Sequence, residues 1–191
     1  MPRRTTRNSL ASEPSDLTDN EGSLLAVILR QQPVTAYQVM RIYELSPVAS
    51  FNKSKGGLYP AINRLRARGF ISAETIEGDR RGSERLSCTE AGGEAVKQWV
   101  KDLREPHFLP IDPLRTKVMS FNLLTRDEQI EWIVDAKAQL AAKLEEVEIY
   151  DTTVEIPFQA LVRDNAVSGI KSRMQWLDRL MQYVVKGGEA A

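Results

Sequence analysis

The sequence predicts a mainly α-helical chain with one small β-hairpin, divided into an N-terminal domain and an all-helical C-terminal domain. Apolar residues recur at three- and four-residue spacing along most of the chain, which is typical of amphipathic helices. The exception is the stretch 70–87, where an apolar run and a shorter expected strand flank a glycine-containing polar loop. Prolines gather where short helical patterns give way to long ones. We therefore expect a disordered basic arm (1–17), an N-terminal domain (18–104) and a helical domain (105–191).

Three short helices are expected first. Thr18 can begin one, with Glu21 as its capping-box partner, and the Gln31-Gln32-Pro33 segment ends it. Thr35 can cap the second, which closes at Ser46-Pro47. Its expected apolar positions are Tyr37, Val39, Met40, Ile42 and Tyr43.

The third helix is expected to begin near Ser54, after a polar loop. Pro60 is acceptable if it falls in the first turn, where backbone N–H groups have no helical partner, and Gly69 stands at the C-terminal end. The apolar positions of this helix are Leu58, Ala61, Ile62 and Leu65.

A β-hairpin and a fourth helix complete the N-terminal domain. Residues 70–76 and 83–87 read as two short strands around a long polar tip, and Thr89 can cap the helix that follows. Its expected buried side holds Ala95, Val96, Trp99, Val100 and Leu103. Three short helices, a hairpin and a helix, in that order, indicate a winged helix-turn-helix.

The C-terminal part predicts a short helix capped by Asp112 and two long ones, the first capped by Thr125 and the second following Pro157. The first long stripe is Ile130, Ile133, Leu140, Leu144 and Val147, with Lys137 as a polar break. The second is Phe158, Leu161, Val162, Ala166, Ile170, Met174, Leu177, Leu180, Met181 and Val184. Such narrow stripes suit antiparallel arms that pack on each other and on a second chain. The alternative is a purely intramolecular helical hairpin.

The segment from Ser54 to Leu65, followed by Gly69-Phe70-Ile71, closely resembles the recognition-helix region of the PadR family of bacterial transcription regulators. The resemblance continues at Thr89-Glu90-Ala91-Gly92, Asp112-Pro113-Leu114-Arg115 and Trp176-Leu177, and it spans nearly the whole chain after residue 20. Lys55, Gly57 and the Arg85-Leu86 pair depart from the family pattern, so sequence specificity cannot be transferred. The resemblance implies that the third helix enters the major groove while the hairpin tip follows the backbone.

Simple chemistry supports a DNA-reading role for this helix. Gly56 and Gly57 keep side chains away from its first N–H groups, Tyr59 can donate to a phosphate, and Asn63 can bond to adenine. Alternatively, Tyr59 is a core residue, and Asn63 and the arginines are a solvated face. The expected DNA-binding residues are Lys53, Ser54, Lys55, Gly57, Tyr59, Asn63, Arg64, Arg80 and Arg81.

Other site chemistry is weakly represented. His107 is the only histidine and Cys88 the only cysteine, so neither a histidine-based triad nor a paired-cysteine metal site is expected. We expect no enzyme, no metal and no cofactor. Members of the PadR family commonly respond to small aromatic or drug-like molecules. Trp99 and Trp176 are the candidates for such an effector pocket, although both also fit apolar stripes as core residues.

Charge is unevenly distributed, although its sum is zero. Residues 1–104 hold 16 basic and 12 acidic residues, and residues 105–191 hold 10 and 14. The basic excess in the first part favours a face that binds double-stranded DNA, and the lack of a signal-peptide or membrane-spanning pattern favours a cytoplasmic protein. With the helical stripes and the family resemblance, we expect a homodimer that is, by family analogy, a repressor. The alternative is a winged-helix protein-interaction module without DNA binding, which would be favoured if acidic residues neutralised the Lys53–Arg81 face.

Overall fold

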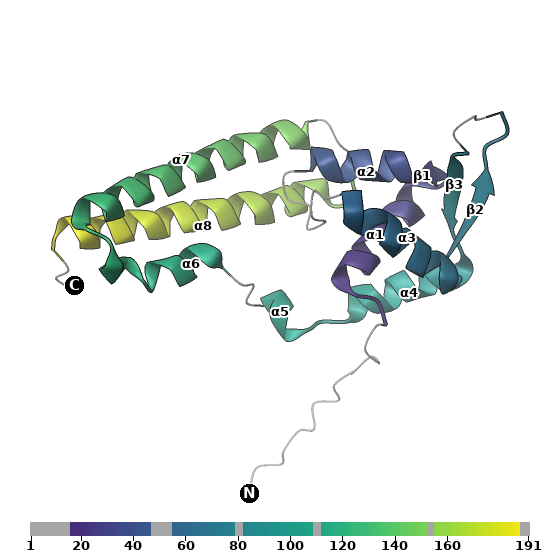
Figure 1. Cartoon of the computed structure of the whole chain (residues 1–191), viewed down its shortest axis with the longest axis horizontal. Helices are drawn as coiled ribbons and strands as arrows, with labels where there is room; N and C mark the ends of the chain where they lie inside the picture. Colours follow the sequence, from purple (N-terminus) through teal and green to yellow (C-terminus); the bar gives the residue numbers. More distant parts are fainter. Residues whose placement is uncertain (1–15, 47–54, 79–81, 109–111, 153–154, 188–191) are drawn as a thin grey trace, which may run out of the picture. The chain divides into compact units, whose positions relative to one another are not determined.

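The computed structural model describes residues 16–46, 55–78, 82–108, 112–152 and 155–187. The chain forms two compact units, one built from α1–α5 and the strands, the other from α6–α8 (Figure 1). The sequence places the domain boundary after residue 104, and this boundary stays a prediction. In the structure α5 belongs to the first unit. In chain order the helices and strands are α1 (Asp19–Gln31), β1 (Val34–Thr35), α2 (Ala36–Leu45), α3 (Lys55–Ala67), β2 (Ile71–Thr75), β3 (Glu84–Cys88), α4 (Glu90–Lys101), α5 (Glu105–Phe108), α6 (Pro113–Val118), the 3-10 turn η1 (Phe121–Leu123), α7 (Arg126–Asp151) and α8 (Gln159–Val185).

Helix α1 is the central element of the first unit and packs against α3, α4 and β3. Its predicted capping box is confirmed: Thr18 Oγ1 accepts from the Glu21 backbone N–H, and the Glu21 carboxylate accepts from the Thr18 N–H, both at 3.3 Å. Leu24, Leu25 and Ile28 have no exposed surface. The cap therefore fixes the start of the helix that supplies most of the core.

Helices α2 and α3 follow the predicted pattern with two corrections. Tyr37 was expected on the apolar side of α2, but 61% of its surface is exposed, because Val39 alone reaches the centre of the core. Pro60 was expected in the first turn of α3, but α3 begins at Lys55, so the proline lies inside the helix. The expected apolar positions of α3 are all buried: Leu58, Ala61, Ile62 and Leu65.

The sheet has three antiparallel strands in the order β1-β3-β2. The predicted hairpin is confirmed as β2 and β3, which pair from Ile71↔Cys88 to Thr75↔Glu84. Strand β1 was not predicted, because two residues are too few to carry an alternating pattern. Leu86 of β3 faces the core with 2% exposure, so the sheet holds the base of the hairpin against the helices.

Helix α4 begins as predicted, with Thr89 Oγ1 accepting from the Gly92 N–H at 3.0 Å. Only part of its expected buried side is covered in the chain. Val96 is buried, whereas Val100 and Leu103 are 64% and 71% exposed. The apolar stripe is thus wider than the surface that α1 offers to it.

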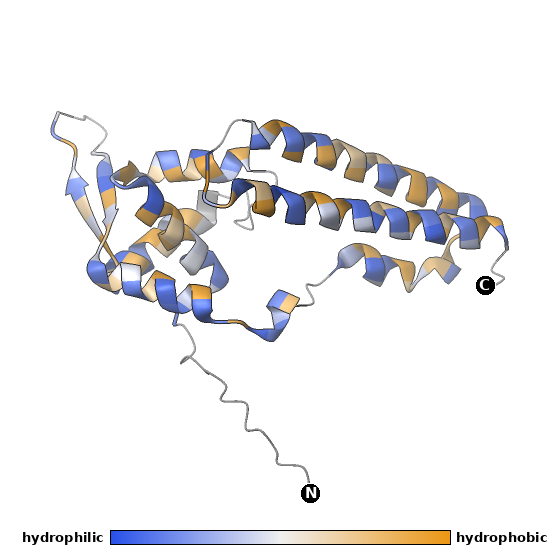
Figure 2. Cartoon of the chain, turned by 180° about the vertical axis from the view of Figure 1, so that it is seen from behind, coloured by the Kyte–Doolittle hydropathy of each residue, from blue (hydrophilic) through white to orange (hydrophobic). Residues whose placement is uncertain are grey.

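The second unit is an antiparallel pair of long helices, α7 and α8, which lie side by side with α6 (Figure 1). The predicted caps are confirmed at Asp112, which accepts from the Leu114 N–H at 3.0 Å, and at Thr125. Figure 2 shows hydrophilic and hydrophobic residues alternating along both long helices. The polar break at Lys137 is explained by its ion pair with Asp178 of α8.

The second long stripe is buried in the chain only from Ile170 onward. At its start Phe158, Leu161 and Val162 are 80%, 69% and 45% exposed, and Phe158 precedes the helix in a left-handed conformation (φ 57°). Their expected packing on a second chain stays a prediction. Within the described residues, no helix combines the length and apolar character that a membrane span requires.

Candidate nucleic-acid interface

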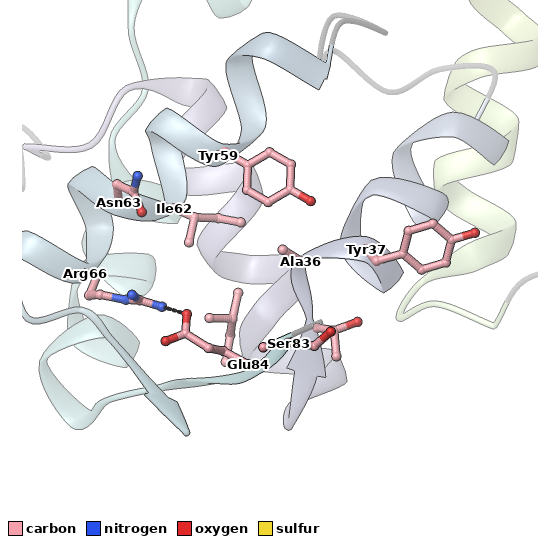
Figure 3. A pocket seen from close by; sticks show the side chains of 11 residues that line it. Ala36, Tyr37, Tyr59, Ile62, Asn63, Arg66, Ser83 and Glu84 are labelled. Atoms are coloured by element: carbon pink, nitrogen blue, oxygen red, sulfur yellow. Dashed lines mark hydrogen bonds and ion pairs between the residues drawn. The ribbon is translucent and has the colours of Figure 1, made fainter. Parts of the chain in front are cut away.

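Helix α3 presents two different faces. Its apolar residues pack into the core of the first unit, while Tyr59, Asn63 and Arg66 follow one another at four- and three-residue spacing on the outward side (Figure 3). Tyr59 is 50% exposed, which removes the alternative that it is a core residue. A helix that exposes a phenol, an amide and a guanidinium along one line offers hydrogen-bond donors to a long polar partner.

An open groove of about 490 Å³ runs beside this face. Its walls come from α3, from the start of α2 and from β3 with the residues just before it (Figure 3). Ile62, Leu86 and Ala36 supply apolar surface in it. The polar residues along it are Thr35, Tyr37, Tyr59, Asn63, Arg66, Ser83 and Glu84.

An ion pair crosses the groove between Arg66 Nη2 of α3 and Glu84 Oε2 of β3 (Figure 3). The two side chains are 39% and 40% exposed. The pair links the outward face of α3 to the end of the β2–β3 ladder that adjoins the hairpin tip, and this hairpin is the wing of the fold. It also partly neutralises the only arginine that lines the groove within the described residues.

Arg64 and Arg68 are directed to a different acid. Arg64 Nε donates to Glu21 Oε1 at 2.8 Å, and Arg68 Nη1 lies 3.9 Å from Glu21 Oε2. Burial alone would raise the pKa of the Glu21 carboxyl, but hydrogen bonds from Arg64 and Thr18 outweigh it, and the pKa lies below its ordinary range. Arg64 therefore ties α3 to the start of α1, and its proposed contact with DNA stays a prediction.

Several predicted contacts fall on residues that the structure does not describe. Lys53, Ser54, Arg80 and Arg81 lie outside the described residues, as does the side chain of Lys55. Gly57 is described and exposed: a Cβ built on it would meet nothing within 4 Å. Of the nine predicted residues, the structure thus brings Gly57, Tyr59, Asn63 and Arg64 onto one helix.

The two tryptophans expected to bind an effector both take part in apolar packing. Trp99 lies against Gly22 of α1, where an added Cβ would come within 2.3 Å of the indole, and its Nε1 donates to Asp19 Oδ1 at 3.1 Å. That hydrogen bond is the main reason why the pKa of the Asp19 carboxyl is lowered. Trp176 packs partly buried on the core of the second unit. Neither lines the groove.

Of the polar residues along the groove, only Tyr59 and Asn63 were among the predicted DNA-binding residues, and Tyr37 is one that the sequence did not single out. The three-four pattern of α2 placed it among apolar positions, and no motif distinguishes an exposed tyrosine from a buried one. Its position two residues after Thr35, which caps α2 through Gln38 at 2.8 and 3.2 Å, is the signal that it lies at a helix start.

The chain matches no family model and no curated protein at a significant level. Solved structures do match over most of its length. One is Bacillus subtilis PadR in complex with operator DNA, with a TM-score of 0.72, 19% identity, and coverage of 86% of this chain and 98% of that one. The PadR-like regulator BC1756 from Bacillus cereus gives a TM-score of 0.69 at 16% identity, with 88% and 97% covered.

A third match is Bacillus subtilis PadR in complex with p-coumaric acid, with a TM-score of 0.69, 17% identity, and coverage of 86% and 97%. These matches extend over the winged-helix part and over the helices that follow it. At sequence identities of 16–19%, these matches establish the fold but not the roles of individual residues. The chain has the fold of the PadR-like winged-helix transcriptional regulators.

Proposed function

We propose that this chain is a cytoplasmic, homodimeric transcription regulator, by analogy a repressor, that reads a palindromic operator through α3. The observation that carries the proposal is the outward face of α3. Tyr59 and Asn63 stand exposed beside the wing, on a fold in which a solved relative holds operator DNA. A winged helix-turn-helix uses this helix in the major groove.

The proposed contacts divide into positioning and reading. Tyr59 of α3 and Tyr37 at the start of α2 donate to backbone phosphates, because both residues line the same groove and are largely exposed. Asn63 bonds a base edge one turn further along the helix. The residues at the helix start and wing tip, which are basic apart from Ser54, add backbone contacts: Lys53, Ser54, Lys55, Arg80 and Arg81.

Dimerisation is proposed to occur through the second unit. Its two long helices keep large apolar side chains exposed, and burying such surface contributes about 25 cal/mol per Å². A twofold dimer would place two copies of α3 about 34 Å apart, matching half-sites one helical turn apart. The exposed residues in question are Val134, Ile149, Leu161, Val162 and Val185.

Selection from random duplex DNA, together with sedimentation equilibrium, tests the proposal. We expect a dimeric mass and an enriched palindrome. Tyr59→Phe should weaken binding to all duplexes by about 1 kcal/mol, since one hydrogen bond to phosphate is lost. Tyr183→Phe, an equally exposed tyrosine on α8, should not. A strictly monomeric protein without affinity for any duplex, even at low salt, would refute the proposal.

Asn63→Ala tests base reading separately. It should relax preference at one base pair by about 1–3 kcal/mol and leave non-specific binding unchanged. Gln98→Ala on α4 removes an exposed amide of similar chemistry far along the chain and serves as the control. If both variants select the same site as the unmodified chain, Asn63 does not read bases.

The second candidate function, a protein-interaction module, is favoured by the acidic partners of the arginines on α3 and directly after it. Arg64, Arg66 and Arg68 each have a carboxylate within 4 Å. DNA binding with a steep salt dependence would exclude this candidate. Effector binding through Trp99 or Trp176 is a further proposal. Quenching of tryptophan fluorescence by p-coumaric acid, the ligand of the solved relative, tests it.

A further inference from the structure

The ion pair between Arg66 and Glu84 joins the outward face of α3 to the wing, at the end of the strand pair that adjoins the wing tip. We propose that Arg66 is a further DNA-contacting residue, held by Glu84 in the free protein and transferred to a backbone phosphate on binding. The inference rests on the proposed function, and it makes Glu84 a residue that lowers the affinity for DNA.

The position of Arg66 supports a contact with the same partner as Tyr59 and Asn63. The three residues recur at four- and three-residue spacing, so they share one side of α3, and all three line the groove. In Figure 3 the Arg66 side chain extends from α3 toward Glu84 across the groove. A phosphate that enters the groove near Tyr59 therefore comes within the reach of the guanidinium.

The partner of Arg66 distinguishes it from Arg64, the other arginine of α3. Arg64 pairs with Glu21, whose side chain is only 8% exposed and is also held by the cap of α1. Removing Arg64 from that acid would leave a buried carboxylate with only the more distant Arg68 as a cationic partner. Glu84 is 40% exposed, so water can solvate its carboxylate when Arg66 leaves. An exposed pair of this kind contributes little, so Arg66 can exchange its partner.

The exchange has a defined chemistry. Before binding, the guanidinium donates to the Glu84 carboxylate; after binding, it donates to phosphate oxygens, which its planar fork matches well. The Glu84 carboxylate then remains beside a phosphate backbone of like charge. Neutralising this carboxylate should therefore strengthen binding twice over, by freeing Arg66 and by removing the repulsion.

Glu84→Gln tests the inference, with Glu74→Gln as a matched control. Glu74 lies on the neighbouring strand β2, is exposed and pairs in register with Arg85, so both variants change the net charge equally. We expect Glu84→Gln to bind the selected duplex about two- to fivefold more tightly than Glu74→Gln does. In an Arg66→Ala background, the advantage of Glu84→Gln over Glu74→Gln should become smaller, because only the loss of repulsion is left. Arg66→Ala alone should reduce the salt slope by about 0.9.

The outcomes separate this inference from the proposed function. If the unmodified chain binds no duplex, both are overturned. If it binds, and Glu84→Gln equals Glu74→Gln or binds more weakly, Arg66 is a structural tie between α3 and the wing, and only this inference is overturned. Circular dichroism melting of each variant shows whether a weaker binder has lost its fold.

Discussion

Two adjacent glycines of α4 should respond in opposite ways to the same substitution. A Cβ added at Gly92 would lie 2.2 Å from the Phe70 carbonyl oxygen and 2.8 Å from Cys88 Sγ. A Cβ added at Gly93 would meet nothing within 4 Å. We therefore predict that Gly92→Ala destabilises the first unit and that Gly93→Ala stabilises it.

The magnitude follows from two opposing contributions. Replacing glycine by alanine inside a helix gains about 1 kcal/mol. Overpacking costs about 1–3 kcal/mol, and the upper end applies at Gly92 because the obstacle is backbone. That carbonyl already accepts the Thr89 N–H at 3.0 Å, so it cannot move without loosening the start of α4. We expect Gly92→Ala to lower the free energy of unfolding by about 1–2 kcal/mol and Gly93→Ala to raise it by about 0.5–1 kcal/mol.

Urea denaturation followed by tryptophan fluorescence measures the difference. Trp99 is the only one of the three tryptophans in the first unit, so Trp132 and Trp176 are replaced by phenylalanine in the test background. The midpoint should fall for Gly92→Ala and rise for Gly93→Ala. Equal stabilisation by both substitutions would refute the close packing of α4 on the turn before β2.

Three further outcomes are expected. Because the pKa of the Glu21 carboxyl is lowered in the folded chain, the ionised carboxylate stabilises the fold above its ordinary pKa, and this stabilisation is lost as the pH falls below about 4.5. Glu21→Gln should therefore flatten the acid dependence of stability, measured as urea unfolding midpoints at a series of pH values. Asp112→Ala should destabilise the second unit by about 1 kcal/mol through loss of the α6 cap, whereas Ser120→Ala, at a cap position without a side-chain hydrogen bond, should change little in thermal melting. Removing Arg64 by Arg64→Ala should cost more stability than Arg66→Ala, because only Arg64 leaves a buried carboxylate behind; equal losses would argue against a buried role for Glu21.

Local rules explain which parts of the fold the sequence could predict. The caps at Thr18, Thr89, Asp112 and Thr125 depend on residues within three positions of each other, so the sequence alone suffices. The width of a buried face depends on what a neighbouring element offers. Val100 was therefore misplaced, although its periodicity is correct.

The candidate site was predictable to a smaller extent for the same reason. Tyr59 and Asn63 could be identified because helical spacing alone puts them on one face. The acids that pair with the arginines could not. Glu21 lies 43 residues before Arg64, and Glu84 lies 18 residues after Arg66. A basic stretch in the sequence therefore does not establish a basic surface, because the acidic residues that pair with its arginines come from other helices and strands.

This neutralisation bears on how the proposed regulator would discriminate between DNA sequences. Non-specific affinity depends on the number of phosphates that free cations neutralise. With Arg64 tied to a buried acid and Arg66 held across the groove, α3 approaches DNA with less charge than its sequence suggests. Its neutral donors, Tyr59 and Asn63, are then relatively more important, and hydrogen bonds of this kind depend on precise placement. A low non-specific affinity increases the ratio between operator and bulk DNA, which is the quantity on which a regulator in a genome depends. The paired arginines would thus favour specificity at the expense of total affinity.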